Sequence, residues 1–309
     1  MVVVTGSLGY IGKYIARVLL DRGEVVRTIT THPGKPNPFG SSIQAFPYHF
    51  DNPELLTDQL RGAQTLYNTY WIRFPYDGKT FEDAVRNTRT LFACARTAGV
   101  RKIVHISVTN ASADSPLPYY RGKGEQESLL VESGVEYSIV RPTLVFGKED
   151  ILVNNIGWLI RHFPFFPIFG NGGYRLQPVF VEDLAHISVD ATRLPSGTIL
   201  DAIGPETYTF DQFISIITKS VGSRCRPIRI PPALGIAFGK LIGLAVGDVV
   251  LTTDELRGLM CNYLSSNQPP NCPTRFSRWL EENKDFLGTR YSSEIRRHFR
   301  WSQPKSEIK

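Results

Sequence analysis

A tyrosine, a lysine and a serine in the first half of the chain have the types and the spacing for proton transfer to a carbonyl or alcohol oxygen. Tyr119 and Lys123 are four residues apart in a helical stretch, so one turn places the ammonium beside the phenol. A phenol has an ordinary pKa of about 10, and a neighbouring cation favours the phenolate. Ser107 closes the preceding apolar run and can hydrogen-bond the same oxygen. The pattern predicts Tyr119 as the acid–base group, oriented by Ser107 and Lys123.

Hydride transfer needs a cofactor, and a glycine loop at the start of the chain predicts one. Residues 5–12 read TGSLGYIG. In this spacing Gly6 permits the turn out of a strand, Gly9 lets the backbone approach a pyrophosphate, and Gly12 lets the helix pack closely on the sheet. The phosphates would lie against free N–H groups at the positive end of that helix. Because the loop joins a strand-like run to a helical one, it predicts binding of a nicotinamide dinucleotide.

Side chains around the loop complete the predicted cofactor site. Asp51 follows a strand-like segment at 45–50 and can accept a hydrogen bond from the adenine amino group. It is equally well placed to cap the helix that starts at Pro53. Lys123 can also hold the nicotinamide ribose. Besides the three glycines, the residues expected to contact the cofactor are Ser7, Tyr10, Ile11, Thr31, Asp51 and Lys123.

The second strand-like run bears on the choice of cofactor. An Asp or Glu near its end would hold the ribose 2′-hydroxyl of NAD. Residues 26–32 read VRTITTH and contain no acid, and Arg27 in mid-strand is as readily a surface residue as a 2′-phosphate clamp. The missing acid favours NADP(H) over NAD(H).

The elements that must position these residues alternate between strand and helix. Short apolar runs alternate with segments of helical periodicity, several of which stop at a glycine. This pattern predicts an α/β fold with a doubly wound parallel Rossmann sheet. The expected strands are 2–5, 25–30, 65–70, 102–107 and 136–140, and the expected helices are 10–22, 53–61, 81–98 and 123–133.

The composition changes after about residue 147, which predicts a second region. We expect an NAD(P)-binding Rossmann domain over 1–147, to which 175–192 returns with a strand at 178–182 and a helix at 184–192. The remainder of 148–309 is expected to be a smaller, mostly helical substrate-binding region. Its predicted helices are 210–221, 233–250, 252–264, 274–286 and 290–299. The Phe-rich stretch 163–169 indicates either an apolar substrate pocket or plain core packing.

Composition excludes several classes of function. The chain has 35 basic and 29 acidic residues, a net charge of +6, and no dense basic cluster of the kind nucleic-acid binders carry. Four cysteines without a CxxC pair and six histidines without metal-ligand spacing predict no metal site. The most apolar stretch, 233–251, is interrupted by Lys240 and Asp248, so we expect no membrane span, although peripheral contact stays open. A strand starting at residue 2 and unpaired cysteines favour the cytoplasm. The oligomeric state is left open.

On these residues the chain resembles the extended or atypical short-chain dehydrogenase/reductase superfamily over roughly residues 1–190. The resemblance implies that the RPxxVFG segment lies beside the nicotinamide, which adds Pro142 to the expected cofactor contacts. Two C-terminal segments, LTTDEL at 251–256 and YSSE at 291–294, are similar to a subgroup that resembles the nucleotide-binding accessory subunit of respiratory complex I. The other matching segments are residues 5–12, Asn87, Leu91, 95–100, 103–107, Tyr119 with Lys123, 141–147 and 179–185.

Departures from the family pattern shape the functional hypotheses. Residues 68–71 read NTYW where sugar-nucleotide epimerases carry a His-Leu-Ala-Ala-like segment, and the Phe-rich stretch suits an apolar ligand. The leading hypothesis is an NAD(P)(H)-dependent oxidoreductase acting on a carbonyl or alcohol of a small-molecule substrate. A nucleotide-sugar epimerase or dehydratase is the second. A non-catalytic NAD(P)H-binding subunit or redox sensor is the third, and the retained tyrosine and lysine argue against it.

Overall fold

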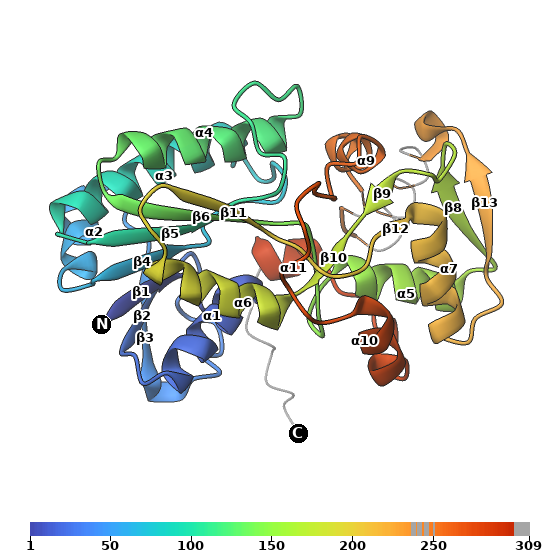
Figure 1. Cartoon of the computed structure of the whole chain (residues 1–309), viewed down its shortest axis with the longest axis horizontal. Coiled ribbons are helices and arrows are strands. Elements are labelled where there is room, and N and C mark those ends of the chain that lie inside the picture. Colours follow the sequence, from blue (N-terminus) through green and yellow to red (C-terminus); the bar gives the residue numbers. More distant parts are fainter. Residues whose placement is uncertain (236–238, 240–242, 244–246, 250, 300–309) are drawn as a thin grey trace.

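The computed structural model describes residues 1–235, 239, 243, 247–249 and 251–299, and its central feature is a parallel β-sheet (Figure 1). The sheet has seven strands in the order β11-β6-β5-β4-β1-β2-β3, and every neighbouring pair is parallel. This is the predicted doubly wound α/β Rossmann fold. The strands are β1 (Val2–Thr5), β2 (Val26–Thr30), β3 (Ile43–Pro47), β4 (Thr65–Asn68), β5 (Lys102–Ile106), β6 (Glu136–Pro142) and β11 (Thr198–Ala202).

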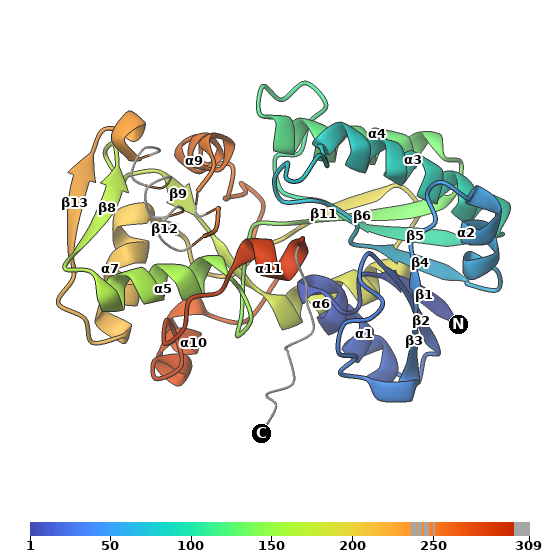
Figure 2. The ribbon, with the colours of Figure 1, turned by 180° about the vertical axis from the view of Figure 1, so that it is seen from behind.

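Helices cover both faces of the sheet and, together with its strands, form the first apolar core. One face packs against α1 (Tyr10–Asp21) and α6 (Val181–Asp190), and the other against α2 (Pro53–Leu60), α3 (Phe81–Thr97) and α4 (Pro118–Glu132) (Figures 1 and 2). Because the strands lie between two helical layers, β1, β4 and β5 are buried along their whole length.

The return of the chain to the sheet differs from the sequence expectation. Strand β10 (Pro178–Phe180) pairs with β7 (Leu144–Phe146) in a separate two-stranded sheet, and helix α6 begins at Val181 instead of residue 184. Glu182 and Asp183 explain the earlier start, since acidic side chains favour the first turn of a helix. The seventh strand, β11, lies outside the expected range 175–192. It was missed because it is a half-exposed edge strand with a weak apolar pattern.

A second apolar core gathers the elements after β7. It is formed by α5 (Leu152–His162), β8 (Phe165–Phe169), α7 (Phe210–Ser220) and α10 (Phe276–Asn283). Two short strands, β9 (Arg175–Leu176) and β12 (Tyr208–Thr209), pair antiparallel beside it. The division near residue 147 therefore remains our proposal for the domain boundary.

Several C-terminal predictions need correction. The helices expected at 252–264, 274–286 and 290–299 are the shorter α9 (Thr253–Met260), α10 and α11 (Glu294–His298). Strand β13 (Arg226–Ile230), which pairs parallel with β8, was not expected, because its residues are mostly exposed and show no alternation. The predicted helix at 233–250 falls largely outside the described residues.

Candidate cofactor and active site

One cavity of about 560 Å³ runs along the carboxyl ends of the parallel strands and into the second core. Ligands of doubly wound sheets bind at this edge. All three predicted catalytic residues and eight of the predicted cofactor contacts line it: Ser107, Tyr119, Lys123, Gly6, Gly9, Tyr10, Ile11, Gly12, Thr31 and Pro142. The cavity thus brings together residues that are more than 130 positions apart in the sequence.

The glycine loop has the geometry of a phosphate cradle. Gly6 has φ +71°, which favours glycine, and a Cβ on Gly12 would lie 2.4 Å from the Gly6 carbonyl oxygen. A Cβ on Gly9 would lie 3.0 Å from the same oxygen. No side chain caps α1, and its first turn carries no acid. Its N–H groups therefore face the cavity without a competing acceptor on a side chain, which fits a dinucleotide's pyrophosphate.

Two predicted cofactor contacts do not line the cavity. Ser7 is buried beneath the loop, where its N–H donates to Thr28 Oγ1 at 3.0 Å. Asp51 is exposed and outside the lining. The cap of α2 is Asn52, whose Oδ1 accepts from the Leu55 N–H at 3.2 Å, so the alternative role of Asp51 as the helix cap is wrong.

Ser107 is engaged by an ion pair behind the cavity. Its hydroxyl donates to Glu127 Oε1, which also accepts from Arg141 Nε at 2.9 Å. Glu127 and Ser107 are both buried. In this arrangement the serine hydroxyl donates to a carboxylate, so donation to a substrate carbonyl oxygen requires its rotation.

Lys123 is buried at the nicotinamide end. Its Nζ donates to the Ile106 carbonyl oxygen at 3.0 Å and lies 5.0 Å from the centre of a Trp71 ring. Burial lowers the pKa of Lys123 to about 7, against a smaller opposite effect of Glu127. Near neutral pH the amine therefore exchanges protons readily.

Tyr119 lies in an aromatic surround in the first turn of α4. Its ring packs edge-on against Trp71 and Phe81, with centroids 5.9 and 6.0 Å apart. Burial raises the pKa of Tyr119 to about 12, and Arg73 acts in the opposite direction. We expected Lys123 to favour the phenolate, whereas here the cation that lowers the pKa is Arg73.

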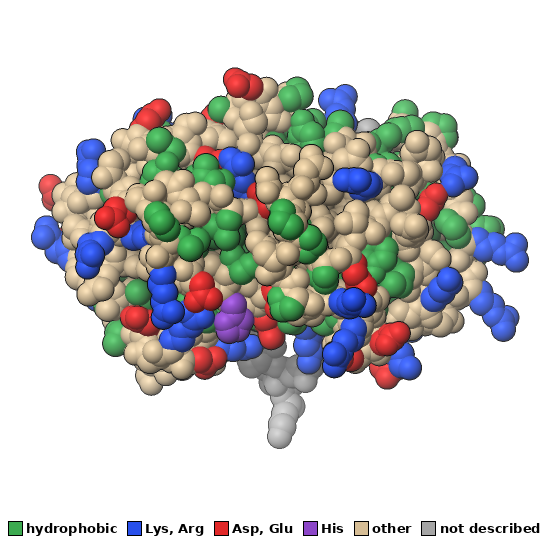
Figure 3. All heavy atoms as spheres, in the orientation of Figure 1, with side chains coloured by type: hydrophobic (Ala, Val, Ile, Leu, Met, Phe, Trp, Pro, Cys, Tyr) green, Lys and Arg blue, Asp and Glu red, His purple; other side chains and the backbone are tan. Residues whose placement is uncertain are grey.

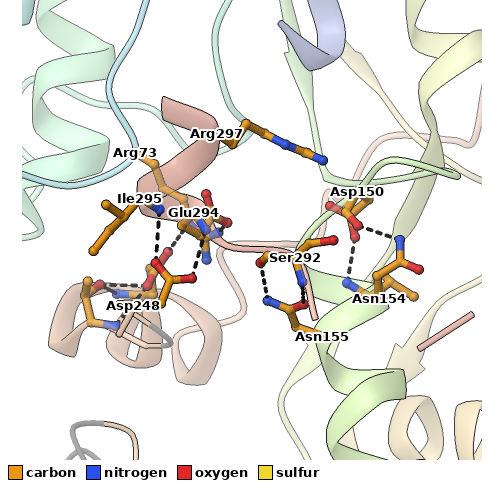
Figure 4. Close-up of polar contacts among 12 residues, drawn as sticks. Arg73, Asp150, Asn154, Asn155, Asp248, Ser292, Glu294, Ile295 and Arg297 are labelled. Atoms are coloured by element: carbon orange, nitrogen blue, oxygen red, sulfur yellow. Dashed lines mark hydrogen bonds and ion pairs between the residues drawn. The ribbon is translucent and has the colours of Figure 1, made fainter. Parts of the chain in front are cut away.

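Sequence reasoning missed a charged group at the rim of the cavity, shown in Figure 4. Arg73 pairs with Glu255 at 2.6 Å and with the buried Glu294 of α11. Arg297, also on α11, points toward the loop of Asp150. Its guanidinium lies 6.0 Å from the centre of the Tyr10 ring, beside the glycine loop. Glu255 and Glu294 lie in the two C-terminal segments that the sequence analysis singled out, 251–256 and 291–294, but nothing in the sequence showed that these segments meet Arg73.

Beyond Tyr119 the cavity becomes apolar. Its wall includes side chains from the Phe-rich stretch, of which Phe166 and Phe169 are buried and also pack against Phe210. The stretch therefore both packs in the second core and lines the cavity, and Phe166 does both. Leu152, Ile156, Leu159, Leu176, Phe213, Leu259 and Leu264 extend the same wall.

Comparison with known proteins agrees with this geometry. A family model described as NAD(P)H-binding matches residues 6–151. An NADPH-dependent quinone oxidoreductase from Escherichia coli, solved with NADPH, superposes with a TM-score of 0.76 and 20% identity over 91% of this chain and 99% of that one. Together with the fold, these matches fit the resemblance to the extended short-chain dehydrogenase/reductase superfamily that the sequence motifs indicate. At this identity the solved structure supports the fold alone.

Curated relatives of the chain include subunits of NADH dehydrogenase. The mitochondrial NADH dehydrogenase [ubiquinone] 1 alpha subcomplex subunit 9 of Dictyostelium discoideum is 26% identical over 69% of this chain, and that of Arabidopsis thaliana is 24% identical over 74%. The matches span 62% and 60% of those proteins' own lengths. Within the described residues, no helix combines the length and hydrophobicity needed to cross a bilayer.

Proposed function

We propose that the chain is an NAD(P)(H)-dependent oxidoreductase that acts on a carbonyl or alcohol of an apolar substrate. The observation that carries the proposal is the continuity of one cavity. It passes from the glycine loop, along Lys123 and Tyr119, into a compartment walled by Phe166 and Phe169. A dinucleotide end, a proton donor and an apolar compartment therefore share one continuous cavity, as a reductase requires.

The cofactor would be held by the backbone and by two cations. The first turn of α1 would take the pyrophosphate, and Gly9 leaves room for its approach. Arg297 adds a positive charge beside that turn, and Lys123 would reach the nicotinamide ribose. When bound, the nicotinamide supplies hydride transfer. Pro142 lines the same part of the cavity.

Tyr119 is best suited to give up a proton in the direction of reduction. With a pKa raised to about 12 by burial, its phenol is protonated at neutral pH. A protonated hydroxyl can donate to a carbonyl oxygen as negative charge develops there. Arg73 stabilises the phenolate left behind. Lys123, whose pKa lies near 7, can then return a proton toward Tyr119.

The apolar compartment limits the substrate. A nucleotide sugar would place a diphosphate against phenylalanine and leucine side chains, which would desolvate its charge without a partner. This disfavours the epimerase alternative. A sterol demethylase protein B from Methylococcus capsulatus, 28% identical over 77% of this chain, is named for an apolar substrate. Its name supports an apolar substrate here.

A non-catalytic NAD(P)H-binding subunit is the second candidate. It is favoured by the engagement of Ser107 with Glu127 and by the likeness to subunits of NADH dehydrogenase. In that case the dinucleotide would bind without turnover.

We retain NADP(H) over NAD(H) as part of the proposal. No acid follows β2, where Thr30 and Thr31 line the cavity. Arg27 is not the 2′-phosphate clamp, because it donates to the Gln59 carbonyl oxygen at 2.7 Å and lies over the Phe46 ring. Cytoplasmic location also stays a prediction, since the relatives named above are mitochondrial by name.

A turnover screen with one pair of variants tests the proposal. Oxidation of NADPH and NADH is followed with apolar quinones, aldehydes and ketones as acceptors. Tyr119→Phe should remove turnover and keep dinucleotide affinity, while Tyr120→Phe, the matched neighbour, should keep both. Dinucleotide binding without turnover of any acceptor would favour the subunit candidate, and equal turnover in Tyr119→Phe would refute the assigned proton donor.

A further inference from the structure

The outward face of the β8–β13 pair carries unusual surface chemistry. Phe165 stands opposite Arg226, and Pro167 stands opposite Ile228. Paired residues of neighbouring strands share a face, and side chains alternate between faces along a strand. Phe166 and Ile168, which alternate with Phe165 and Pro167, are buried in the second core. Phe165 and Ile228 therefore point away from that core.

Large apolar side chains continue along this face into the solvent. Phe163 is 40% exposed, Phe165 53%, Ile228 42% and Leu234 58%. Leu234 lies close to the end of β8, because a Cβ on the adjacent Gly235 would lie 2.3 Å from Phe169. These are four of the ten exposed large hydrophobic residues in the described ranges. Soluble proteins usually scatter such residues singly, whereas contiguous ones mark interaction sites.

The same patch is positively charged. Arg224 and Arg226 are exposed and form no ion pair with any residue that the structure describes. Arg229, the third arginine of the segment, is paired with Asp211 at 2.7 Å. Figure 3 shows blue side chains among green ones at the end of the molecule where Figure 1 draws β13. An apolar row flanked by unpaired cations suits an apolar surface rimmed by negative charge.

The patch is also an opening of the cavity. Phe163 and Phe165 line the cavity and are at the same time about half exposed. A side chain can meet both conditions only where the cavity reaches the surface. The apolar compartment therefore opens at Phe163 and Phe165, on the face that also carries the exposed Ile228.

We propose that this face docks on a membrane containing anionic lipid, with the cavity mouth turned toward the bilayer. The four apolar side chains enter the interfacial layer, while Arg224 and Arg226 pair with headgroup phosphates. A substrate dissolved in lipid then reaches the compartment without crossing water. Docking does not depend on the proposed redox function, and only the delivery of substrate rests on it.

Vesicle flotation of the full chain tests the docking. We expect binding to phosphatidylcholine vesicles that contain phosphatidylglycerol, little binding to phosphatidylcholine alone, and weakening with added salt. Ile228→Ser with Leu234→Ser should lower binding by roughly tenfold or more, because neither residue lines the cavity and both would enter the lipid. Val131→Ser with Leu55→Ser, two comparably exposed residues on α4 and α2, is the control and should bind like wild type.

Charge removal gives an independent measurement. Arg224→Ala and Arg226→Ala should each lower binding to the anionic vesicles about fivefold, and Arg89→Ala, at an exposed arginine of α3, should not. Absence of binding to anionic vesicles, or equal binding of the patch and control variants, would overturn the proposal. Thermal shifts with NADPH on the same samples separate membrane docking from the proposed dinucleotide-dependent function. A chain that is stabilised by NADPH but does not float with the anionic vesicles contradicts the docking proposal and leaves the proposed function intact.

Discussion

Gly9→Val offers the sharpest separation of cofactor binding from folding. Gly9 has φ −94° and ψ −169°, which is extended backbone that any residue adopts, so no strain arises from the dihedral angles. A Cβ there would lie 3.0 Å from the Gly6 carbonyl oxygen, a few tenths of an ångström too close. We therefore expect a loss of about 1 kcal/mol in the free energy of unfolding, at the low end for overpacking. The branched side chain would nevertheless occupy the approach of the pyrophosphate.

The assay is thermal unfolding with and without dinucleotide. A ligand at 100 times its Kd stabilises the folded state by about 2.7 kcal/mol, which wild type should show with at least one of NAD⁺, NADP⁺, NADH and NADPH. Gly9→Val should melt close to unliganded wild type and show no ligand-dependent shift. Gly173→Ala is the control, because a Cβ there has no neighbour closer than 3.5 Å. Stabilisation of Gly9→Val equal to that of wild type would refute the loop as the phosphate site.

Four further outcomes are expected from single changes. Gly12→Ala should cost about 1–3 kcal/mol of unfolding free energy in a denaturant titration, because its Cβ would meet the Gly6 backbone at 2.4 Å; an unchanged midpoint would contradict this packing. Arg297→Gln should weaken ADP-ribose about tenfold in calorimetry and leave adenosine 2′-monophosphate unchanged, since the guanidinium lies beside the pyrophosphate end. For Lys123, burial holds the folded pKa near 7, so the unfolded chain binds the extra proton between about pH 7 and 10.5 and stability should rise over that window; Lys123→Met should flatten this rise in a pH series of melts. Phe276→Ala should destabilise the chain by about 3–5 kcal/mol, because Phe276 is fully buried in the second core.

The elements of the first half of the chain could be predicted from the sequence, because the local sequence patterns agree there with the tertiary packing. Apolar strand runs and helices ending near glycines such as Gly99 and Gly134 place the sheet directly. Strands β11 and β13 were not predicted, because an edge strand needs no continuous apolar pattern. Such a strand is defined by its pairing with a neighbouring strand. Only the folded chain shows that residues 198–202 continue the sheet beyond β6.

The motif residues of the candidate site could be predicted from the sequence, but the charges that act on them could not. Tyr119 and Lys123 follow from helical spacing, but the cation that acts on Tyr119 is Arg73, which lies 46 positions earlier in the sequence. Ser7, in the glycine loop, was expected to contact the cofactor. The positive φ of Gly6 instead directs the Ser7 N–H toward Thr28. The sequence shows which residues a loop contains. The direction in which each backbone or side-chain group points depends on the strand that packs beside the loop.

The charged rim suggests why the C-terminal segment matters to a site built mostly by the first half. Asp248 accepts hydrogen bonds from the N–H groups of Glu294 and Ile295 at 2.8 and 3.0 Å, which anchors the start of α11. Lys35, on the loop after β2, donates to the Arg297 carbonyl oxygen at 2.7 Å. In Figures 1 and 2, α11 lies between the sheet and the second core. Helix α11 also provides Glu294, which pairs with Arg73, the cation that lowers the pKa of Tyr119. One helix therefore contacts both the proposed pyrophosphate site, through Arg297, and the cation beside the proposed proton donor, through Glu294. Any shift of α11 on cofactor binding would therefore reach the proton donor through a single ion pair.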